Sequence, residues 1–250
     1  MSAFTFLEDL EQGRRIGLDI GSRSTKAAFT DGDVIGTEMM DTADFIYGGF
    51  IEGLKGFDVV TTGYGRNRVV HARKVPEIRA HTLGVLRSTG IDSFTLLDIG
   101  GQDFKVVRVD KKGIRDFHMN DKCAAGTGRF LEKMGEMLSM SVEELGCHRG
   151  DSKVLESTCS VFTETELISL MMEGATRDQL ASGVIYSVYE RVRPYLRMFP
   201  ADTVVFSGGV SGCTGLVETL KEGLSVDVVV PERAQFMGAV GAMLVKDRYR

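Results

Sequence analysis

Short apolar runs alternate with glycine-containing turns through the first half of the chain. They have the length and β-branched content of strands and lie at 14–21, 25–40 and 57–63. The pair Asp31-Gly32 inside the second run predicts a hairpin turn. A helix is expected over 76–89, because Pro76 suits a first helical turn and Gly90 suits the stop.

The same pattern recurs further along the chain. The stretch 93–120 again reads as a strand, a glycine turn, a second strand, a turn and a third strand. Its core DIGGQDFK, from Asp98 to Lys105, parallels the earlier DIGSRSTK, from Asp19 to Lys26. Both begin with Asp-Ile-Gly, and both place a lysine seven residues after the aspartate. Two such copies indicate an internal repeat of a β-hairpin with a phosphate-binding turn.

Helical patterns dominate after residue 120. Helices are predicted at 125–139, 141–147, 163–173 and 177–199. The last of these has one apolar face, formed by Leu180, Val184, Val188, Val192 and Leu196. A final α/β section is predicted, with strands at 202–209 and 226–230 and helices at 211–223 and 234–247. No linker interrupts the chain. Because the β-rich unit is duplicated and carries helical insertions, we expect an α/β fold with two similar lobes closing on one cleft.

Composition narrows the range of functions. The 250 residues carry a net charge of −5 and no basic block, which disfavours a nucleic-acid surface. No stretch has the roughly 18 apolar residues that span a bilayer, and the first residues lack the pattern of a secretory signal. We therefore expect a cytoplasmic protein whose four cysteines stay reduced and bind metal, react or, most often, pack in the core.

Glycine turns directly after buried strands are suited to phosphate. Without a Cβ, their backbone N–H groups can approach a phosphate closely, and an aspartate at the strand end can hold Mg²⁺ through water. One such turn is usually an ordinary tight turn. This chain has two, at Asp19 and Asp98, and a third glycine turn at Ser207-Gly208-Gly209. Together the three predict a nucleotide site.

Six stretches resemble the ATP-dependent activators of 2-hydroxyacyl-CoA dehydratases, within the actin/hexokinase/Hsp70 ATPase superfamily. They are LDIGSRSTK, TTGYGR, LLDIGGQDFK, NDKCAAGTGRFLE, CSVFTETELISL and FSGGV. They follow the family's order from about residue 14 to 247, and the benzoyl-CoA reductase ATPase subunits are more distant relatives. Two places depart from the family pattern. Phe104 stands where serine is common, and Ser211, Gly212 and Cys213 replace the usual end of the adenosine motif.

The resemblance implies an actin-like, ribonuclease H-like fold with two duplicated lobes around a nucleotide cleft. Residues 1–92 would form the first lobe and 93–230 the second, with 231–250 as a C-terminal helix packing back on the first lobe. The catalytic residues it implies are Asp19, Asp98, Gln102 and Asp103. The nucleotide-binding residues it implies are Gly21, Ser22, Ser24, Thr25, Lys26, Gly100, Gly101, Gly126, Gly128, Gly208, Gly209 and Gln235.

Two cysteines 36 residues apart, Cys123 and Cys159, each precede a predicted helix. A thiol at a helix N-terminus faces the positive end of the dipole, which favours the thiolate that binds soft metals and iron–sulfur clusters. After Cys159, Thr163 and Glu166 have capping-box spacing. Two ligands cannot complete a Cys₄ set, although two identical subunits could supply four. From the residues alone, packed thiols remain the favoured interpretation.

The resemblance favours a cluster instead. It implies a homodimer that holds one [4Fe–4S] cluster between its subunits, with Cys123 and Cys159 as the ligands of each chain. Cys147 and Cys213 match no ligand position, and His148 beside Cys147 is weak evidence for a metal. The remaining histidines show no partner spacing: His71, His81 and His118.

The predicted function is an ATP-dependent, low-potential, single-electron donor that activates a partner iron–sulfur acyl-CoA dehydratase or reductase. The resemblance implies ATP/ADP, Mg²⁺ and the cluster as cofactors, a transient complex with the partner enzyme, and an upstream ferredoxin or flavodoxin as electron source. No nucleic acid or membrane partner is expected. The alternatives are a small-molecule, sugar-type kinase of the same superfamily and a filament or scaffold ATPase. Neither gives Cys123 and Cys159 a task.

Overall fold

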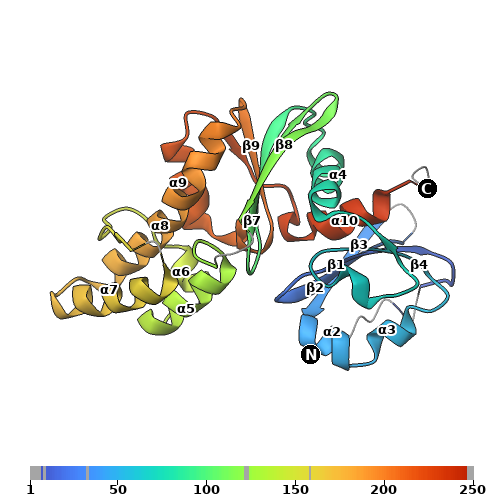
Figure 1. The fold of residues 1–250 in the computed structure, drawn as a ribbon, viewed down its shortest axis with the longest axis horizontal. Helices are drawn as coiled ribbons and strands as arrows, with labels where there is room; N and C mark the ends of the chain where they lie inside the picture. Colours follow the sequence, from blue (N-terminus) through green and yellow to red (C-terminus); the bar gives the residue numbers. More distant parts are fainter. Residues whose placement is uncertain (1–6, 8–9, 32–33, 121–123, 158, 247–250) are drawn as a thin grey trace. The chain divides into compact units, whose positions relative to one another are not determined.

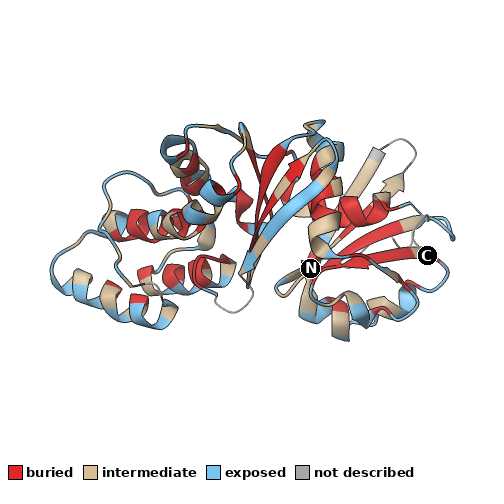
Figure 2. Ribbon diagram, turned by 45° about the horizontal axis from the view of Figure 1, so that its top comes forward, coloured by how far each residue is buried: buried red, intermediate tan, exposed pale blue. Residues whose placement is uncertain are grey.

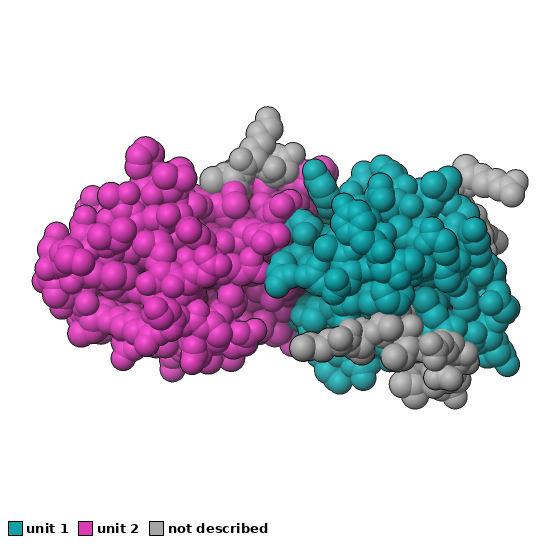
Figure 3. Space-filling model, turned by 90° about the horizontal axis from the view of Figure 1, so that it is seen from below, with its two compact units in different colours: residues 1–91, 231–250 teal, residues 92–230 magenta. Residues whose placement is uncertain are grey.

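The computed structural model of the chain (Figure 1) describes residues 7, 10–31, 34–120, 124–157 and 159–246. The chain forms two compact units, which Figure 3 shows in different colours. Unit 1 combines residues 1–91 with residues 231–250, and unit 2 consists of residues 92–230. None of the helices in the described part of the chain has both the length and the apolar character that a membrane span requires.

Unit 1 is built on a five-stranded sheet in the order β3-β2-β1-β4-β5 (Figure 1). Neighbours among the first three strands are antiparallel, whereas β4 runs parallel to β1 and β5 runs parallel to β4. The strands are β1 (Arg15–Ile20), β2 (Ser24–Asp31), β3 (Val34–Asp41), β4 (Asp58–Thr62) and β5 (Arg73–Lys74). Pairing of Asp31 with Val34 confirms the predicted hairpin, while Gly32 lies outside the described residues.

Helices pack on both faces of the sheet of unit 1. Alternate side chains of a strand point to opposite faces, so β1 can serve two cores. Ile16 and Leu18 pack in a cluster with Phe45 of α2, whereas Ala28 of β2 packs with Ala239 of α10. The helices are α2 (Thr42–Tyr47), α3 (Phe50–Gly53), η1 (Arg66–Arg68), α4 (Glu77–Thr89), η3 (Ala234–Phe236) and α10 (Met237–Leu244). α4 and α10 also pack on each other.

Unit 2 repeats this sheet topology in the order β10-β9-β6-β7-β8. Its strands are β6 (Phe94–Ile99), β7 (Phe104–Asp110), β8 (Gly113–Asn120), β9 (Thr203–Ser207) and β10 (Asp227–Val229). In both sheets the central strand has an antiparallel hairpin on one side and parallel strands on the other. Asp19 lies opposite Lys26 across the β1–β2 pair, as Asp98 lies opposite Lys105 across the β6–β7 pair. The predicted internal repeat is therefore confirmed.

The helices of unit 2 pack around α8, whose predicted apolar face is confirmed. Leu180, Val184, Val188, Val192 and Leu196 are all buried there, and Figure 2 shows this face in red. The helices are α5 (Gly128–Leu138), α6 (Val142–Gly146), α7 (Ser160–Met172), α8 (Arg177–Met198), η2 (Gly209–Gly212) and α9 (Thr214–Gly223). In contrast to α8, α7 buries only two of its side chains. The core of unit 2 therefore depends far more on α8 than on α7.

The start of α7 differs from the prediction. The helix begins at Ser160 rather than at residue 163. The predicted capping box of Thr163 and Glu166 is wrong, because the Glu166 carboxylate accepts hydrogen bonds from the backbone N–H groups of Glu156 (2.7 Å) and Ser157 (2.9 Å). The side chain thus fixes the segment before the helix instead of capping the helix.

The start of α9 also departs from the sequence pattern. The helix expected from residue 211 is preceded by the 3₁₀ turn η2 and begins only at Thr214. The predicted stop of α4 is confirmed, since Gly90 caps the helix with a positive φ of 70°. The short elements α2, α3 and β5 were not predicted, because runs of two to six residues carry too little periodicity.

Candidate nucleotide-binding site

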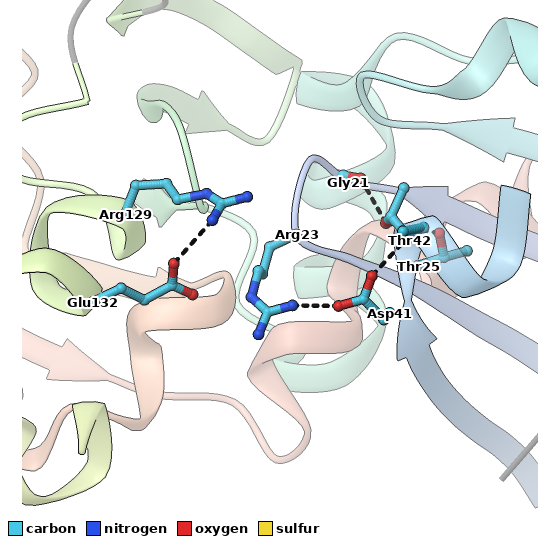
Figure 4. A network of polar contacts seen from close by, with 8 residues as sticks. Gly21, Arg23, Thr25, Asp41, Thr42, Arg129 and Glu132 are labelled. Atoms are coloured by element: carbon cyan, nitrogen blue, oxygen red, sulfur yellow. Dashed lines mark hydrogen bonds and ion pairs between the residues drawn. The ribbon is translucent and has the colours of Figure 1, made fainter. Parts of the chain in front are cut away.

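The turn that follows β1 is fixed by hydrogen bonds within unit 1. Asp19, next to the end of β1, is buried, and in the turn the N–H of Gly21 donates to the carbonyl oxygen of Ser24 (3.2 Å). The Thr42 hydroxyl donates to the carbonyl oxygen of Gly21 (2.8 Å) and lies 3.0 Å from the Thr25 hydroxyl (Figure 4). These contacts attach the turn to the start of α2.

Two further residues predicted to bind the nucleotide, Ser22 and Lys26, follow Gly21 in the chain. Ser22 and Lys26 are half-buried, and Arg23 between them forms an ion pair with Asp41 (Figure 4). Asp41 also caps α2 by accepting a hydrogen bond from the N–H of Ala43 (2.8 Å). The turn therefore gathers hydroxyl groups and a lysine, which are the donors that a phosphate requires.

The second turn, after β6, has the same internal bond and a further attachment to α5. The N–H of Gly100 donates to the carbonyl oxygen of Asp103 (2.9 Å). The N–H of Gly128 donates to the carbonyl oxygen of Gly100 (2.9 Å), and the Thr127 hydroxyl donates to that of Gly101 (3.0 Å). The structure thus brings together the predicted Gly100, Gly101 and Gly128, although the amide of Gly128 is already bonded within the protein.

Charge at the second turn is compensated by a buried lysine. Lys105 Nζ lies 2.9 Å from Asp103 Oδ1 and 3.6 Å from Asp98 Oδ2. Asp98 and Lys105 are only 2% and 1% exposed, and Asp98 also accepts a hydrogen bond from the Ser207 hydroxyl (3.2 Å). Gln102, in contrast, is exposed at the tip of the turn. Asp103 is therefore held by Lys105, and only Gln102 projects into solvent.

A glycine after the neighbouring parallel strand lies against each aspartate. Gly208 has a φ of +92°, and a Cβ at that position would lie 2.5 Å from Asp98 Oδ1. Gly63 has a φ of +83°, and its Cβ would lie 2.5 Å from Asp19 Oδ1. Gly208 was among the predicted nucleotide-binding residues, but Gly63 was not. Only the parallel strand pairing, in which Thr62-Gly63 and Ser207-Gly208 hold the same register against the two aspartates, reveals the equivalence of the two glycines.

The remaining predicted nucleotide-binding residues include Gly208 and Gly209, which were expected to flank the adenosine, and Gly126 and Gln235. Gly209 is exposed at the start of η2, where the Ser211 hydroxyl donates to the carbonyl oxygen of Gly208 (2.7 Å). Ser211, which departs from the family motif, thus stabilises this turn through its hydroxyl group. Gln235 is half-buried in η3 of unit 1, and Gly126 is buried just before α5 in unit 2. Their role toward a nucleotide stays a prediction.

His81 has a partner that the sequence analysis did not foresee. Its Nε2 lies 3.6 Å from Asp19 Oδ2, and both side chains are buried. Glu77, one turn earlier on α4, contributes a carboxylate to the same group. The expectation that His81 lacks a partner is therefore wrong. The available signal was a Glu and a His four residues apart on a predicted helix, which places them on one face.

Of the two predicted cluster ligands, only Cys159 belongs to the described residues, and Cys123 lies outside them. Cys159 is exposed and occupies the N-cap position of α7, where its side chain makes no capping hydrogen bond. Cys147 is exposed and its thiol donates to the carbonyl oxygen of Glu143 (3.2 Å). Burial, with a smaller contribution from Cys147, raises the pKa of the Cys213 thiol to about 12. Cys159 thus combines exposure with a helix N-terminus.

His148, His118 and Phe104 contact other side chains of unit 2. His148 Nε2 lies 3.2 Å from Asp178 Oδ1, an exposed carboxylate. His118 stacks on Tyr195 with ring centroids 3.9 Å apart, and Phe104 packs against the same tyrosine at 5.5 Å. Phe104 is buried in the core of unit 2, so this departure from the family pattern fills space within the protein.

Comparison with known proteins places these features in a family. Residues 48–245 match the model of the BadF/BadG/BcrA/BcrD ATPase family. The chain is 39% identical over 249 residues to the activator of lactoyl-CoA dehydratase of Anaerotignum propionicum, which covers 92% of this chain and 95% of that protein.

Two solved structures are similar over nearly the whole chain. The activator of the 2-hydroxyisocaproyl-CoA dehydratase from Clostridium difficile, solved with bound ADPNP, is 34% identical with a TM-score of 0.82 over 92% of this chain and 93% of that one. Component A of the (R)-2-hydroxyglutaryl-CoA dehydratase of Acidaminococcus fermentans is 32% identical with a TM-score of 0.83 over 93% and 96%. The predicted actin-like fold of two lobes, each on a mixed five-stranded sheet, is confirmed. The chain is an ATPase and belongs to the BadF/BadG/BcrA/BcrD ATPase family.

Proposed function

We propose that this ATPase is an ATP-dependent single-electron donor that activates a 2-hydroxyacyl-CoA dehydratase or a related iron–sulfur acyl-CoA reductase. One observation carries the proposal, namely similarity over more than nine-tenths of the chain to proteins named as activators or component A of such dehydratases. The fold alone would not suffice, because one fold hosts many functions.

The two turns after β1 and β6 are proposed to bind the phosphates of ATP. In unit 1 the donors would be Lys26 and the hydroxyl groups of Ser22, Ser24 and Thr25, because the amide of Gly21 is already bonded to the carbonyl oxygen of Ser24. In unit 2 the amide of Gly101 would serve the same purpose, because the amide of Gly100 is already bonded to the carbonyl oxygen of Asp103. Gln102 is the better candidate to position the attacking water, since it is exposed while Asp103 is held by Lys105. Gly208, Gly209 and Gln235 would contact the adenosine.

The two aspartates do not fit a magnesium ion equally well. Mg²⁺ prefers hard oxygen ligands and keeps several waters. Asp19 offers a buried carboxylate beside Glu77, which fits such an ion. Asp98 lies 3.6 Å from the ammonium group of Lys105, which already compensates its charge. We therefore assign Asp19 to the ion and Asp98 to orienting its own turn, a narrower role than the sequence predicted for Asp98.

Cys159 is proposed as one of the two cluster ligands that each chain supplies, with Cys123 as the other. An exposed thiol at the start of α7 is accessible to a second subunit and faces the positive end of the helix dipole. Two chains would then complete a Cys₄ set. When bound, a [4Fe–4S] cluster supplies the low-potential electron. The chain's own contribution is to hold Cys159 in place, which Glu166 does by fixing the backbone of Ser157.

Nucleotide binding is proposed to bias two arrangements of the chain. A ligand shifts such an equilibrium only if it binds one arrangement more tightly. The turn after β6 is bonded to the N-terminus of α5, which follows the segment that contains Cys123. A change at Gly100 or Gly101 would thus reach that segment directly. The electron would come from a ferredoxin or flavodoxin and pass to the partner enzyme in a transient complex.

Anaerobic purification followed by an electron-transfer assay tests the proposal. The expected protein is a brown homodimer with about four iron per dimer that reduces a partner dehydratase only in the presence of ATP. Cys159→Ala should lose the iron and keep binding an ATP analogue, whereas the matched Cys147→Ala should keep both. A colourless monomer that phosphorylates a sugar would support the kinase alternative. Full iron content in Cys159→Ala would refute the ligand assignment.

A further inference from the structure

Three side chains of unit 1 converge from two elements that are distant in the sequence. Asp19 comes from the end of β1, and Glu77 and His81 come from the first turns of α4. Their carboxylate oxygen and imidazole nitrogen atoms all lie within 4.8 Å of one another. Asp19 and His81 are 5% and 3% exposed, and Glu77 is half-buried. This is the size and the donor composition of a metal site.

The convergence depends on a glycine in a third element. A Cβ at Gly238, in α10, would lie 2.6 Å from Asp19 Oδ2 and 2.6 Å from His81 Nε2. Real side chains do not approach so closely, so a larger residue at 238 would have to displace both groups. The absence of a side chain at Gly238 therefore allows the Asp19 carboxylate and the His81 imidazole to lie close to each other.

The repeat in unit 2 provides an internal comparison. Asp98 occupies the position equivalent to Asp19, but the group beside it is the ammonium of the buried Lys105. The equivalent lysine of unit 1, Lys26, is half-buried, and the side chains gathered at Asp19 are instead an imidazole and a second carboxylate. In unit 2 a lysine side chain supplies the positive charge beside the aspartate. In unit 1 the side chains beside the aspartate are possible ligands of a metal cation.

We propose that Asp19, Glu77 and His81 form a divalent-cation site that includes an imidazole ligand and therefore binds Mn²⁺ more tightly than Mg²⁺. Carboxylates suit both ions, but an imidazole nitrogen favours a transition metal over the harder Mg²⁺. The site deepens the proposed function, because it specifies the ion that accompanies ATP in unit 1. It does not require a cluster or a partner enzyme, so the two proposals can fail separately.

Binding of Mn²⁺ in the absence of nucleotide tests the site. The full-length protein is freed of divalent ions with EDTA, any iron is kept oxidised, and free Mn²⁺ is followed by its electron paramagnetic resonance signal during titration. The expected result is about one Mn²⁺ per chain, held about tenfold or more tightly than Mg²⁺ in competition. Pulsed resonance of the bound ion should show coupling to one imidazole nitrogen. Bound Mn²⁺ without nitrogen coupling in the wild-type protein would refute the proposal without any variant.

Substitutions then assign the ligands. His81→Gln should remove the nitrogen coupling and weaken Mn²⁺ binding about tenfold or more. Glu77→Gln, Asp19→Asn and Gly238→Ala should weaken it similarly. The matched control is Glu52→Gln, at an exposed carboxylate of α3 in the same unit, which should leave Mn²⁺ affinity unchanged. Equal losses in Asp19→Asn and Glu52→Gln, or unchanged affinity in His81→Gln, would overturn the assignment.

Discussion

Gly208 lies directly against the carboxylate of Asp98. A Cβ at residue 208 would approach Asp98 Oδ1 and the carbonyl oxygen of Ile99 to 2.5 Å each. Gly63 has the same relation to Asp19, with a Cβ distance of 2.5 Å from Oδ1, and both glycines have a positive φ. In each unit the residue that follows the parallel strand next to the aspartate must therefore be glycine, which leaves room for the carboxylate.

Replacing either glycine by alanine should be costly. Gly208→Ala and Gly63→Ala combine a left-handed backbone with a collision against a carbonyl oxygen, so each should destabilise the fold by about 1–3 kcal/mol. The displaced aspartate should also weaken binding of an ATP analogue. Thermal unfolding and a binding titration measure the two effects. Gly212→Ala is the stability control, since no atom lies within 4 Å of its Cβ. Equal stability of Gly208→Ala and Gly212→Ala would contradict this packing.

The internal repeat could be predicted from the sequence because the contacts that define it are local. Asp-Ile-Gly and a lysine seven residues later specify a hairpin whose two strands are adjacent in the chain, so the pairs Asp19–Lys26 and Asp98–Lys105 could be predicted. The relation of Gly63 to Asp19 depends instead on a parallel pairing across some forty residues. Nothing in the local pattern marks it.

The group around His81 was missed for a different reason. His81 lies within a helix that was predicted correctly, but its partner is on β1, and only the packing of α4 and α10 beside that strand brings them together. Glu166 shows the converse case. Its spacing from Thr163 fits a capping box, yet the helix begins earlier and the carboxylate finds the amides of Glu156 and Ser157. The positions of the His81 and Glu166 side chains are both determined by contacts with residues outside their own helices.

Lys105 should be far more important to stability than the equivalent Lys26. Lys105→Met would leave Asp98 and Asp103 without the ammonium between them, and removal of one partner of a buried ion pair costs about 3–5 kcal/mol. Lys26→Met, at a half-buried position, should cost less than about 1 kcal/mol. Urea unfolding compares the two variants. Adding Asp98→Asn to Lys105→Met should restore part of the loss, and no restoration would argue against the charge pair as its cause.

Glu166 should make stability depend on pH. Burial alone would raise the pKa of its carboxyl, but hydrogen bonds from the N–H of Glu156 and from the side chain and N–H of Ser157 outweigh it and hold the pKa below its ordinary value. A carboxyl with a lowered pKa stabilises the fold above its ordinary pKa of about 4.3, and this contribution is lost as pH falls through the lower folded value. The wild type should thus exceed Glu166→Gln by about 1 kcal/mol at pH 7.

The difference should disappear in acid. Unfolding of the two proteins measured from neutral pH down to about pH 3 should show curves that converge below the ordinary carboxyl range. Glu164→Gln is the matched control on the same helix, because Glu164 forms only a surface ion pair with Lys133 at 3.8 Å. A constant gap between wild type and Glu166→Gln over the whole range would contradict the carboxylate as its source. Glu166→Gln should also retain less iron, because the segment before Cys159 loses its attachment.

The thiols should differ in reactivity in an order set by their surroundings. With iron in place, iodoacetamide should alkylate the exposed Cys147 first, while the proposed cluster protects Cys159. Removal of iron with a chelator should make Cys159 react as well. Cys213 should stay unmodified in both states, because it is 7% exposed and its pKa of about 12 keeps it a protonated thiol at neutral pH. It should react only after unfolding in urea. Mass spectrometry of the peptides reads each site, and labelling of Cys159 at the same rate before and after iron removal would mean that it is not a ligand.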